Sequence, residues 1–185
     1  MEGRLIQKIY WGDTANGGNY LYGSVIDHFD KKVQFENLRF ASGKPIKRWH
    51  SRTNYQGDRQ SPNLPLLRPG YRYRIEHNYS VEPEGRAYIE LQYFNRQGEV
   101  VGLDILKNGE QEFVYPADAF TYNMALVSAG CQRVYFSDIA LYVLDEIDTH
   151  YQSRKAMGYY SQNRYPQDLE FVTGLIRNTR EEEGV

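Results

Sequence analysis

Only one cysteine, Cys131, occurs in the 185 residues, so the chain cannot form an intrachain disulfide. The absence of disulfides fits a reducing compartment. The first 30 residues carry charges of both signs and no long apolar core, so they lack the features of a secretory signal. No stretch approaches the roughly 20 apolar residues that a membrane helix needs. We therefore expect a cytoplasmic protein with no integral membrane insertion.

The chain also lacks a strong charge of one sign, because its formal net charge is −2. We therefore do not expect nucleic acid to be a partner, since nucleic-acid binding normally requires a marked positive excess. The charges are nevertheless distributed unevenly. Residues 44–74 contain eight basic residues and one acid, Asp58, whereas residues 145–185 contain eight acids and five basic residues. This distribution predicts a local positive patch at one end of the molecule.

Catalytic sequence motifs are missing as well. The chain has no Gly-x-Ser-x-Gly elbow, no Walker glycine loop, no His-Glu-x-x-His and no Cys-x-x-Cys. The four histidines are scattered, and His28 between Asp27 and Asp30 is more typical of a solvated turn than of a metal site. Cys131 follows Ala129-Gly130 with no activating neighbour. We expect neither catalytic residues nor a metal or cofactor.

Tyrosine is abundant, with 17 copies, and apolar residues recur with a period of two. Ile89, Leu91 and Tyr93 alternate with polar neighbours, and three further runs show the same period. These runs are residues 71–79, 120–126 and 135–143, with His77 expected as a hydrogen-bonded core residue and Tyr135, Ser137, Ile139, Leu141 and Val143 expected on one face. Turn signals at 95–98, 108–109 and 69–70 separate the runs. Nine or ten strands without intervening helices predict an all-β, antiparallel jelly-roll sandwich spanning residues 1–145.

Two segments depart from this strand pattern. Residues 51–69 contain Pro62 and Pro65 and are polar up to Leu64, which predicts a long surface loop. Residues 146–185 are acidic, and Leu169, Val172 and Ile176 after Pro166 share one helical stripe. We expect a short, partly helical C-terminal extension that either packs on the sandwich or docks into a partner's groove.

Aromatic and cationic residues are interleaved between Trp49 and Arg74, a mixture that suits sugar rings, nucleic-acid bases or protein docking. The leading hypothesis is a surface that holds partner proteins. The alternative is a carbohydrate site, in which aromatic rings stack on sugars and amide or guanidinium groups bind hydroxyls. The candidate carbohydrate- or partner-binding residues are Trp11, Trp49, Arg52, Asn54, Tyr55, Gln56, Arg59 and Tyr93.

Several short motifs resemble one bacterial family over about residues 8–143. They are Ile9-Tyr10-Trp11, residues 20–24, residues 33–37, Ser42-Gly43, Trp49, Asn54-Tyr55-Gln56 with Arg59, residues 64–67, and Gly70-Tyr71. Together they resemble the smallest of the three accessory secretory proteins of the bacterial accessory Sec system. Residues 69–141 are separately similar to jelly-roll carbohydrate-binding modules.

The family resemblance implies a non-catalytic subunit of a cytoplasmic complex, located peripherally at the membrane through the export machinery. It implies as partners two larger accessory secretory proteins, the accessory motor ATPase and a serine-rich-repeat glycoprotein adhesin whose export the complex assists. Within this frame the chain acts as a scaffold or adaptor. The alternative is a module that recognises the adhesin's N-acetylhexosamine glycans.

Overall fold

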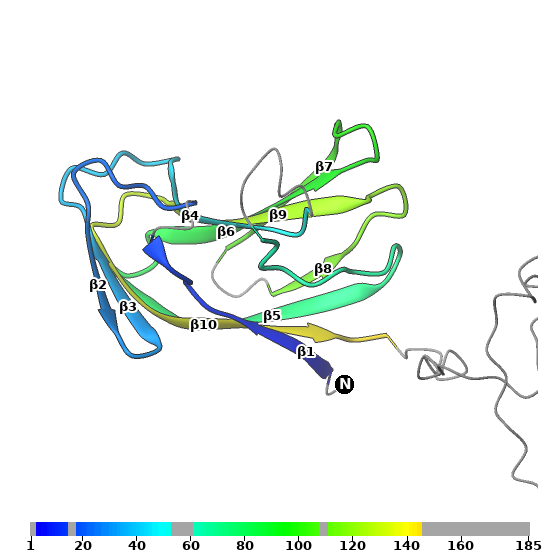
Figure 1. The fold of residues 1–185 in the computed structure, drawn as a ribbon, viewed down its shortest axis with the longest axis horizontal. Helices are drawn as coiled ribbons and strands as arrows, with labels where there is room; N and C mark the ends of the chain where they lie inside the picture. Colours follow the sequence, from blue (N-terminus) through cyan, green and yellow to red (C-terminus); the bar gives the residue numbers. More distant parts are fainter. Residues whose placement is uncertain (1–2, 15–17, 53–60, 108–110, 146–185) are drawn as a thin grey trace, which may run out of the picture. The chain divides into compact units, whose positions relative to one another are not determined.

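The computed structural model describes residues 3–14, 18–52, 61–107 and 111–145. Ten strands form in these ranges, all paired antiparallel in two facing sheets (Figure 1). They are β1 (Arg4–Ile9), β2 (Val25–Phe29), β3 (Lys32–Glu36), β4 (Pro45–His50), β5 (Arg72–Glu82), β6 (Ala87–Phe94), β7 (Val100–Leu106), β8 (Glu112–Val114), β9 (Thr121–Ser128) and β10 (Arg133–Val143). The predicted antiparallel β-sandwich is confirmed.

The six-stranded sheet has the order β2-β3-β10-β5-β8, and β1 pairs with β10 beside this path. The four-stranded sheet has the order β4-β9-β6-β7. One edge of β10 is shared by two strands, because β3 pairs with Arg133–Phe136 and β1 pairs with Ile139–Val143. The sequence-distant first and last strands therefore lie side by side.

Strand alternation places the core between the two sheets, as predicted. In β6, Ile89, Leu91 and Tyr93 are almost completely buried, while Tyr88, Glu90 and Gln92 are partly exposed. Successive side chains of a strand point to opposite faces, so one face of each sheet faces the other sheet.

The expected face assignment in β10 is wrong for its first half. Val134 and Phe136 are buried and Tyr135 is 40% exposed, whereas Ile139 and Leu141 are buried further along. A β-bulge between Phe136 and Asp138 inserts an extra residue opposite β5 and reverses the alternation. The bulge therefore turns Tyr135 outward, although strict alternation would have turned it into the core.

The connection between β6 and β7 matches its predicted turn. The Asn95 amide donates to the Glu99 carbonyl at 2.9 Å, and the Gly98 amide donates to the Asn95 carbonyl at 3.1 Å. Gly98 has a φ of 84°, a left-handed conformation that glycine adopts without a Cβ penalty. The predicted Asn108-Gly109 turn lies outside the described residues.

The segment 51–69 is less exposed than expected at its described positions. Leu64 is 5% exposed and Leu67 is 9% exposed, and the Ser51 hydroxyl accepts the Tyr122 amide at 2.9 Å. Part of this loop thus contributes to the core. The expected helical extension, residues 146–185, lies outside the described residues.

Candidate functional site

The two tryptophans proposed as binding residues form the centre of an aromatic core cluster. Trp11 is 1% exposed and Trp49 is 0% exposed. Trp11 packs edge-to-face against Trp49 and against Phe136, and the Trp49 indole nitrogen donates to the Tyr10 carbonyl at 2.8 Å. A stacking platform needs an exposed ring face, which neither indole offers. The structure therefore corrects the expected stacking role of both residues.

Tyr93 is likewise a core residue, only 1% exposed. Its ring lies edge-to-face with Tyr115, which in turn contacts Tyr122, and its hydroxyl donates to the Asp104 carboxylate at 2.8 Å. Burial, followed by the hydrogen bond to Asp104, raises the pKa of Tyr93 far above its ordinary value. Because the Tyr93 ring has no free face, it cannot stack on a sugar, and its expected role in carbohydrate binding is wrong.

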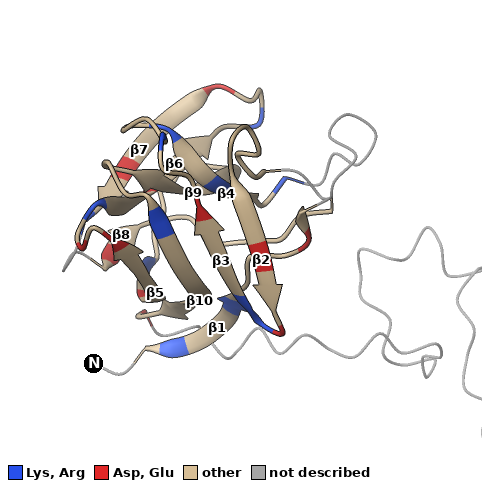
Figure 2. Cartoon of the chain, turned by 90° about the vertical axis from the view of Figure 1, so that its left-hand side faces the viewer, with Lys and Arg blue, Asp and Glu red and all other residues tan. Residues whose placement is uncertain are grey.

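The described residues of the predicted positive patch lie on both sheets. Lys47 and Arg48 lie on β4 in the four-stranded sheet, whereas Arg72 and Arg74 lie on β5 in the six-stranded sheet. Figure 2 shows basic residues on strands of both sheets. The basic residues, which follow one another in the sequence, are therefore divided between the two layers of the sandwich.

Several members of the basic run also have acidic partners or are buried. Arg72 binds Asp145 at 2.9 Å, and Arg74 binds Glu76 at 3.1 Å. Lys47 is 2% exposed, with its ammonium 5.9 Å from the centre of the Trp11 ring. Burial lowers the pKa of Lys47 to about 8, partly opposed by the negative charge of Asp13. These cations are therefore less available to a polyanion than their number suggests.

Arg52 is exposed and lies on an accessible groove, unlike the buried Trp11, Trp49 and Tyr93. It lines a hollow of about 470 Å³ together with Phe94, Arg96, Phe120 and Asn123. The Arg96 guanidinium lies 5.2 Å from the centre of the Phe120 ring, and Phe120 is 55% exposed. The sequence pattern placed Phe120 in the alternating run 120–126 and gave no signal for Arg96, since alternation alone does not locate the end of a strand. Two guanidinium groups beside an exposed ring suit an acidic or aromatic segment of a protein partner.

The remaining candidates, Asn54, Tyr55, Gln56 and Arg59, lie outside the described residues. Their binding role, and that of Arg52, stays a prediction.

Exposed apolar side chains gather near the start of β2. The buried Asn37 donates its side-chain amide to the Tyr22 carbonyl and to the Ser24 hydroxyl, both at 3.0 Å. These bonds hold together two turns that expose Tyr22 (87%) and Leu38 (60%). Apolar side chains held outward by buried polar anchors favour contact with another protein.

A second apolar group lies on β7, at one edge of the four-stranded sheet. Val100, Leu103 and Ile105 are 55%, 51% and 42% exposed. Within the described residues β7 pairs with β6 alone, so its other edge presents backbone groups as well. Such an edge can accept a strand from a partner.

Within the described ranges, no group of three or more His, Cys, Asp or Glu side chains could hold a metal ion. The His28 Nε2 lies 2.8 Å from the Thr14 hydroxyl, and Cys131 is buried, which raises the pKa of its thiol. His77 differs from its expectation of a hydrogen-bonded core residue, because its buried Nε2 has no hydrogen-bond partner among these residues. No helix long and apolar enough to cross a membrane occurs in the described part of the chain.

The family model and the sequence relatives that match this chain all point to the same family. The family model for the accessory Sec secretory system ASP3 matches residues 19–143. The accessory Sec system protein ASP3 of Streptococcus gordonii is 37% identical over 139 residues, which cover 70% of this chain and 87% of that protein. The protein of the same name from Staphylococcus aureus (strain NCTC 8325 / PS 47) is 25% identical over 149 residues, which cover 80% of this chain and 46% of that protein.

Solved structures agree with the sequence relatives. A chain in the crystal structure of accessory secretory protein 1, 2 and 3 of Streptococcus pneumoniae has a TM-score of 0.69 and 30% identity, covering 76% of this chain and 97% of that one. A chain in the glycosylation-associated Gap123 complex of Streptococcus agalactiae has a TM-score of 0.67 and 34% identity, covering 81% of this chain and 48% of that one. The resemblance inferred from the short motifs is thereby confirmed, and the chain belongs to the accessory Sec secretory system ASP3 family.

Proposed function

We propose that this chain is a non-catalytic scaffold or adaptor in an accessory secretory complex that assists the export of serine-rich-repeat glycoprotein adhesins. The observation that carries the proposal is its similarity to a chain solved together with accessory secretory proteins 1 and 2 in S. pneumoniae, almost all of which it covers. Two larger accessory secretory proteins are the proposed partners, and the accessory motor ATPase and the adhesin are proposed contacts of the assembly.

The surface of the sandwich supports a role in assembly. Exposed Tyr22 and Leu38 at one place and the apolar edge strand β7 at another offer two separate areas for protein contact. The groove beside Arg52 and Phe120 offers a third, more polar one. A subunit that joins two companions needs more than one contact area, which a two-layer sandwich with several exposed edges provides.

The proposed location is the cytoplasm, at the membrane only through the export machinery. There the complex would meet the adhesin before translocation.

The test in the host cell is deletion of the gene, followed by measurement of the adhesin on the cell surface. We expect surface adhesin to fall strongly and to return when the chain is supplied from a plasmid, while proteins exported by the general Sec route stay unchanged. Unchanged surface adhesin in the deletion strain would contradict the proposed function.

A further inference from the structure

The two edges of the four-stranded sheet differ in what covers them. β4 forms one edge, and residues 18–20 run along it, because Asn19 bridges Lys47 and the Tyr20 amide donates to the Ile46 carbonyl at 3.0 Å. β7 forms the other edge, and among the described residues it pairs with β6 alone (Figure 1). In that part of the chain β7 therefore presents an unpaired row of backbone amide and carbonyl groups.

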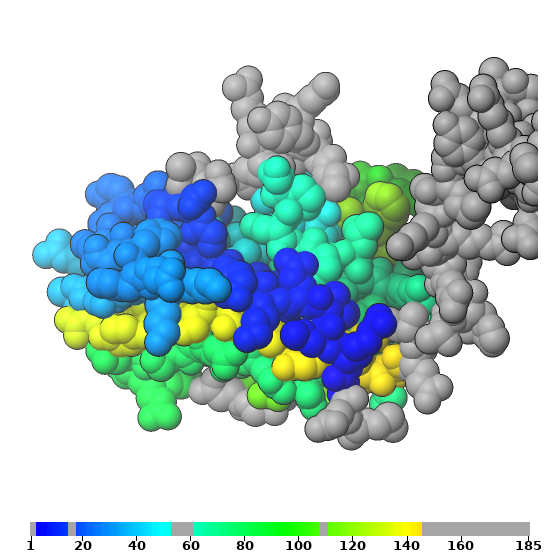
Figure 3. Space-filling model, turned by 60° about the horizontal axis from the view of Figure 1, so that its bottom comes forward, coloured from blue at the N-terminus to red at the C-terminus, as the bar shows by residue number. Residues whose placement is uncertain are grey.

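The other strands at the edges of the sandwich carry features that oppose further pairing. β1 has two cations, Arg4 and Lys8, and an irregular register. β8 has three residues, and β2 has five, which include Asp27 and His28. The long strand β10 is covered along both edges, and Figure 3 shows β1 in blue beside it in yellow. Short strands, bulges and charged side chains are the usual protection of a sheet edge.

β7 has little of this protection. Its sequence, Val-Val-Gly-Leu-Asp-Ile-Leu, contains no lysine, arginine or proline. Its one charged residue, Asp104, accepts the Tyr93 hydroxyl at 2.8 Å, and its irregularity lies at the first pair, so Gly102–Leu106 keeps a regular register. Leu103 and Ile105, on the outer face, are 51% and 42% exposed. An open apolar edge of this kind promotes unwanted association unless a partner covers it.

The groove lined by Arg52 and Arg96 adjoins the first residue of this edge. Val100 pairs with Phe94, and Phe94 lines the groove of about 470 Å³. The Phe120 amide donates to the Phe94 carbonyl at 2.7 Å, which holds the exposed Phe120 ring at the same end of the sheet. The edge of β7 and the groove therefore form one continuous surface.

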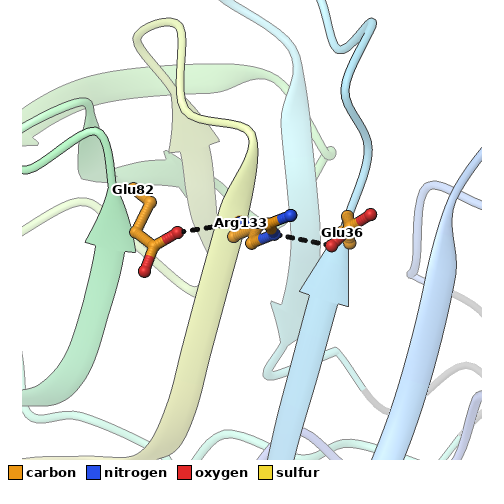
Figure 4. Close-up of polar contacts among 3 residues, drawn as sticks. All are labelled: Glu36, Glu82 and Arg133. Atoms are coloured by element: carbon orange, nitrogen blue, oxygen red, sulfur yellow. Dashed lines mark hydrogen bonds and ion pairs between the residues drawn. The ribbon is translucent and has the colours of Figure 1, made fainter.

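The positive charge of this surface is uncompensated in the described part of the chain. Arg52 and Arg96 form no ion pair there, and no described acidic residue lines their groove. Arg133 shows the opposite arrangement, because Glu36 at 2.6 Å and Glu82 at 3.3 Å bind its guanidinium (Figure 4). Arginines without carboxylate partners attract carboxylates from another molecule.

A second copy of this chain fits the surface less well than an acidic segment of a different protein. If two β7 strands paired antiparallel, Leu106 of one copy would lie near Val100 of the other. Lys107 would then approach Arg52 and Arg96 of the neighbouring copy, and like charges oppose such pairing. A segment that carries carboxylates has the complementary charge.

We propose that β7 accepts an extended segment of a companion accessory secretory protein as a fifth strand of the sheet. Apolar side chains of that segment pack on Leu103 and Ile105, and its carboxylates bind Arg52 and Arg96. In strand addition, main-chain hydrogen bonds supply affinity and side chains supply specificity. The inference rests on the proposed function, because a companion in the assembly supplies the segment. It unites the β7 edge and the groove, two of the three contact areas, in one site.

The test measures the affinity of the purified full chain for its two purified companion proteins by biolayer interferometry. Leu103→Lys should weaken association roughly tenfold, since it places a charge in an apolar contact. Arg96→Glu should also weaken it roughly tenfold, since it sets a carboxylate against carboxylates.

Two matched control variants lie on the other sheet. Val114→Lys places the same charge on β8, where Val114 is 53% exposed, and Arg4→Glu reverses an exposed charge on β1. Both should stay within about twofold of the parent chain. Circular dichroism checks that each variant is folded.

Hydrogen exchange distinguishes strand addition from contact through side chains alone. When the companions are added, alternate amides of Gly102–Leu106 should exchange at least about tenfold more slowly, while those of β8 stay unchanged. If the chain associates but the β7 and groove variants match their controls, or β7 gains no protection, the inference is wrong and the scaffold function stands. If the parent chain does not associate with its companions, both are wrong. A dimer of the chain alone that Leu103→Lys dissociates would assign the edge to a second copy and overturn the proposal.

Discussion

At the scale of single residues, the burial of Lys47 makes the stability of the protein depend on pH. Its side chain is 2% exposed, and burial lowers its pKa from 10.5 to about 8. The unfolded state therefore binds more protons than the folded state between pH 8 and 10.5, and the contribution of Lys47 to stability rises with pH across that window. At neutral pH the folded protein must keep a charged ammonium largely out of water, which costs free energy.

Lys47→Met should remove this pH dependence. The free energy of unfolding of the parent chain, relative to the variant, should rise by about 2 kcal/mol between about pH 7.5 and about pH 9.5. Urea unfolding at both pH values measures it, and groups common to both chains, such as Cys131, cancel in the difference. A difference that stays constant across the two pH values would show that Lys47 titrates normally.

The two tryptophans make the burial of the aromatic cluster directly measurable. Because Trp11 and Trp49 are both at most 1% exposed, acrylamide should quench the native fluorescence weakly and the urea-unfolded fluorescence strongly. Phe120→Trp supplies an exposed reporter on the same fold and should add a strongly quenched component. Equal quenching of the native and unfolded parent chain would mean that an indole is exposed, as the carbohydrate-site hypothesis for Trp11 and Trp49 required.

At the scale of strands and turns, the sequence pattern predicted most of what forms. Ile89, Leu91 and Tyr93 show the period of two expected for one buried face, and Asn95–Gly98 has the residues that a tight turn needs. The bulge in β10 could not be predicted, because Tyr135 to Val143 carries bulky residues at both parities. One extra residue reverses the faces without changing composition.

Gly98 tests the turn that was predicted correctly. A Cβ added there meets no atom within 4 Å, so the cost of Gly98→Ala is conformational and comes from the φ of 84°. We expect a loss of about 1 kcal/mol in the free energy of unfolding, and a smaller loss for Gly98→Asn, since asparagine tolerates left-handed backbone. Chemical denaturation of the three proteins gives the comparison, and an alanine variant as stable as the parent would contradict the turn geometry.

At the scale of the whole molecule, the sandwich rearranges what the sequence places together. The basic run 44–74 is divided between two sheets, and Arg72 and Arg74 find acidic partners in Asp145 and Glu76. Among the binding candidates, aromatic residue type indicated Trp11 and Trp49, but the same chemistry that favours stacking on sugars also favours burial in a core. Only exposure separates the two outcomes, and exposure depends on pairing between distant strands, which composition does not specify.

Family membership was predictable for a different reason. Short motifs at Trp11, Trp49 and Leu64 lie far apart in the sequence, yet all three side chains are buried in the structure. They therefore report the packing of the common fold and not a ligand site. This explains how these motifs could identify the family correctly although Trp11 and Trp49 are core residues.

The central claim is that this sandwich functions as one subunit of an accessory secretory assembly. Native mass spectrometry after co-expression with its two larger companions tests that claim most directly. We predict one dominant species that contains all three proteins. A spectrum in which the companions associate with each other while this chain remains a free monomer would contradict the account.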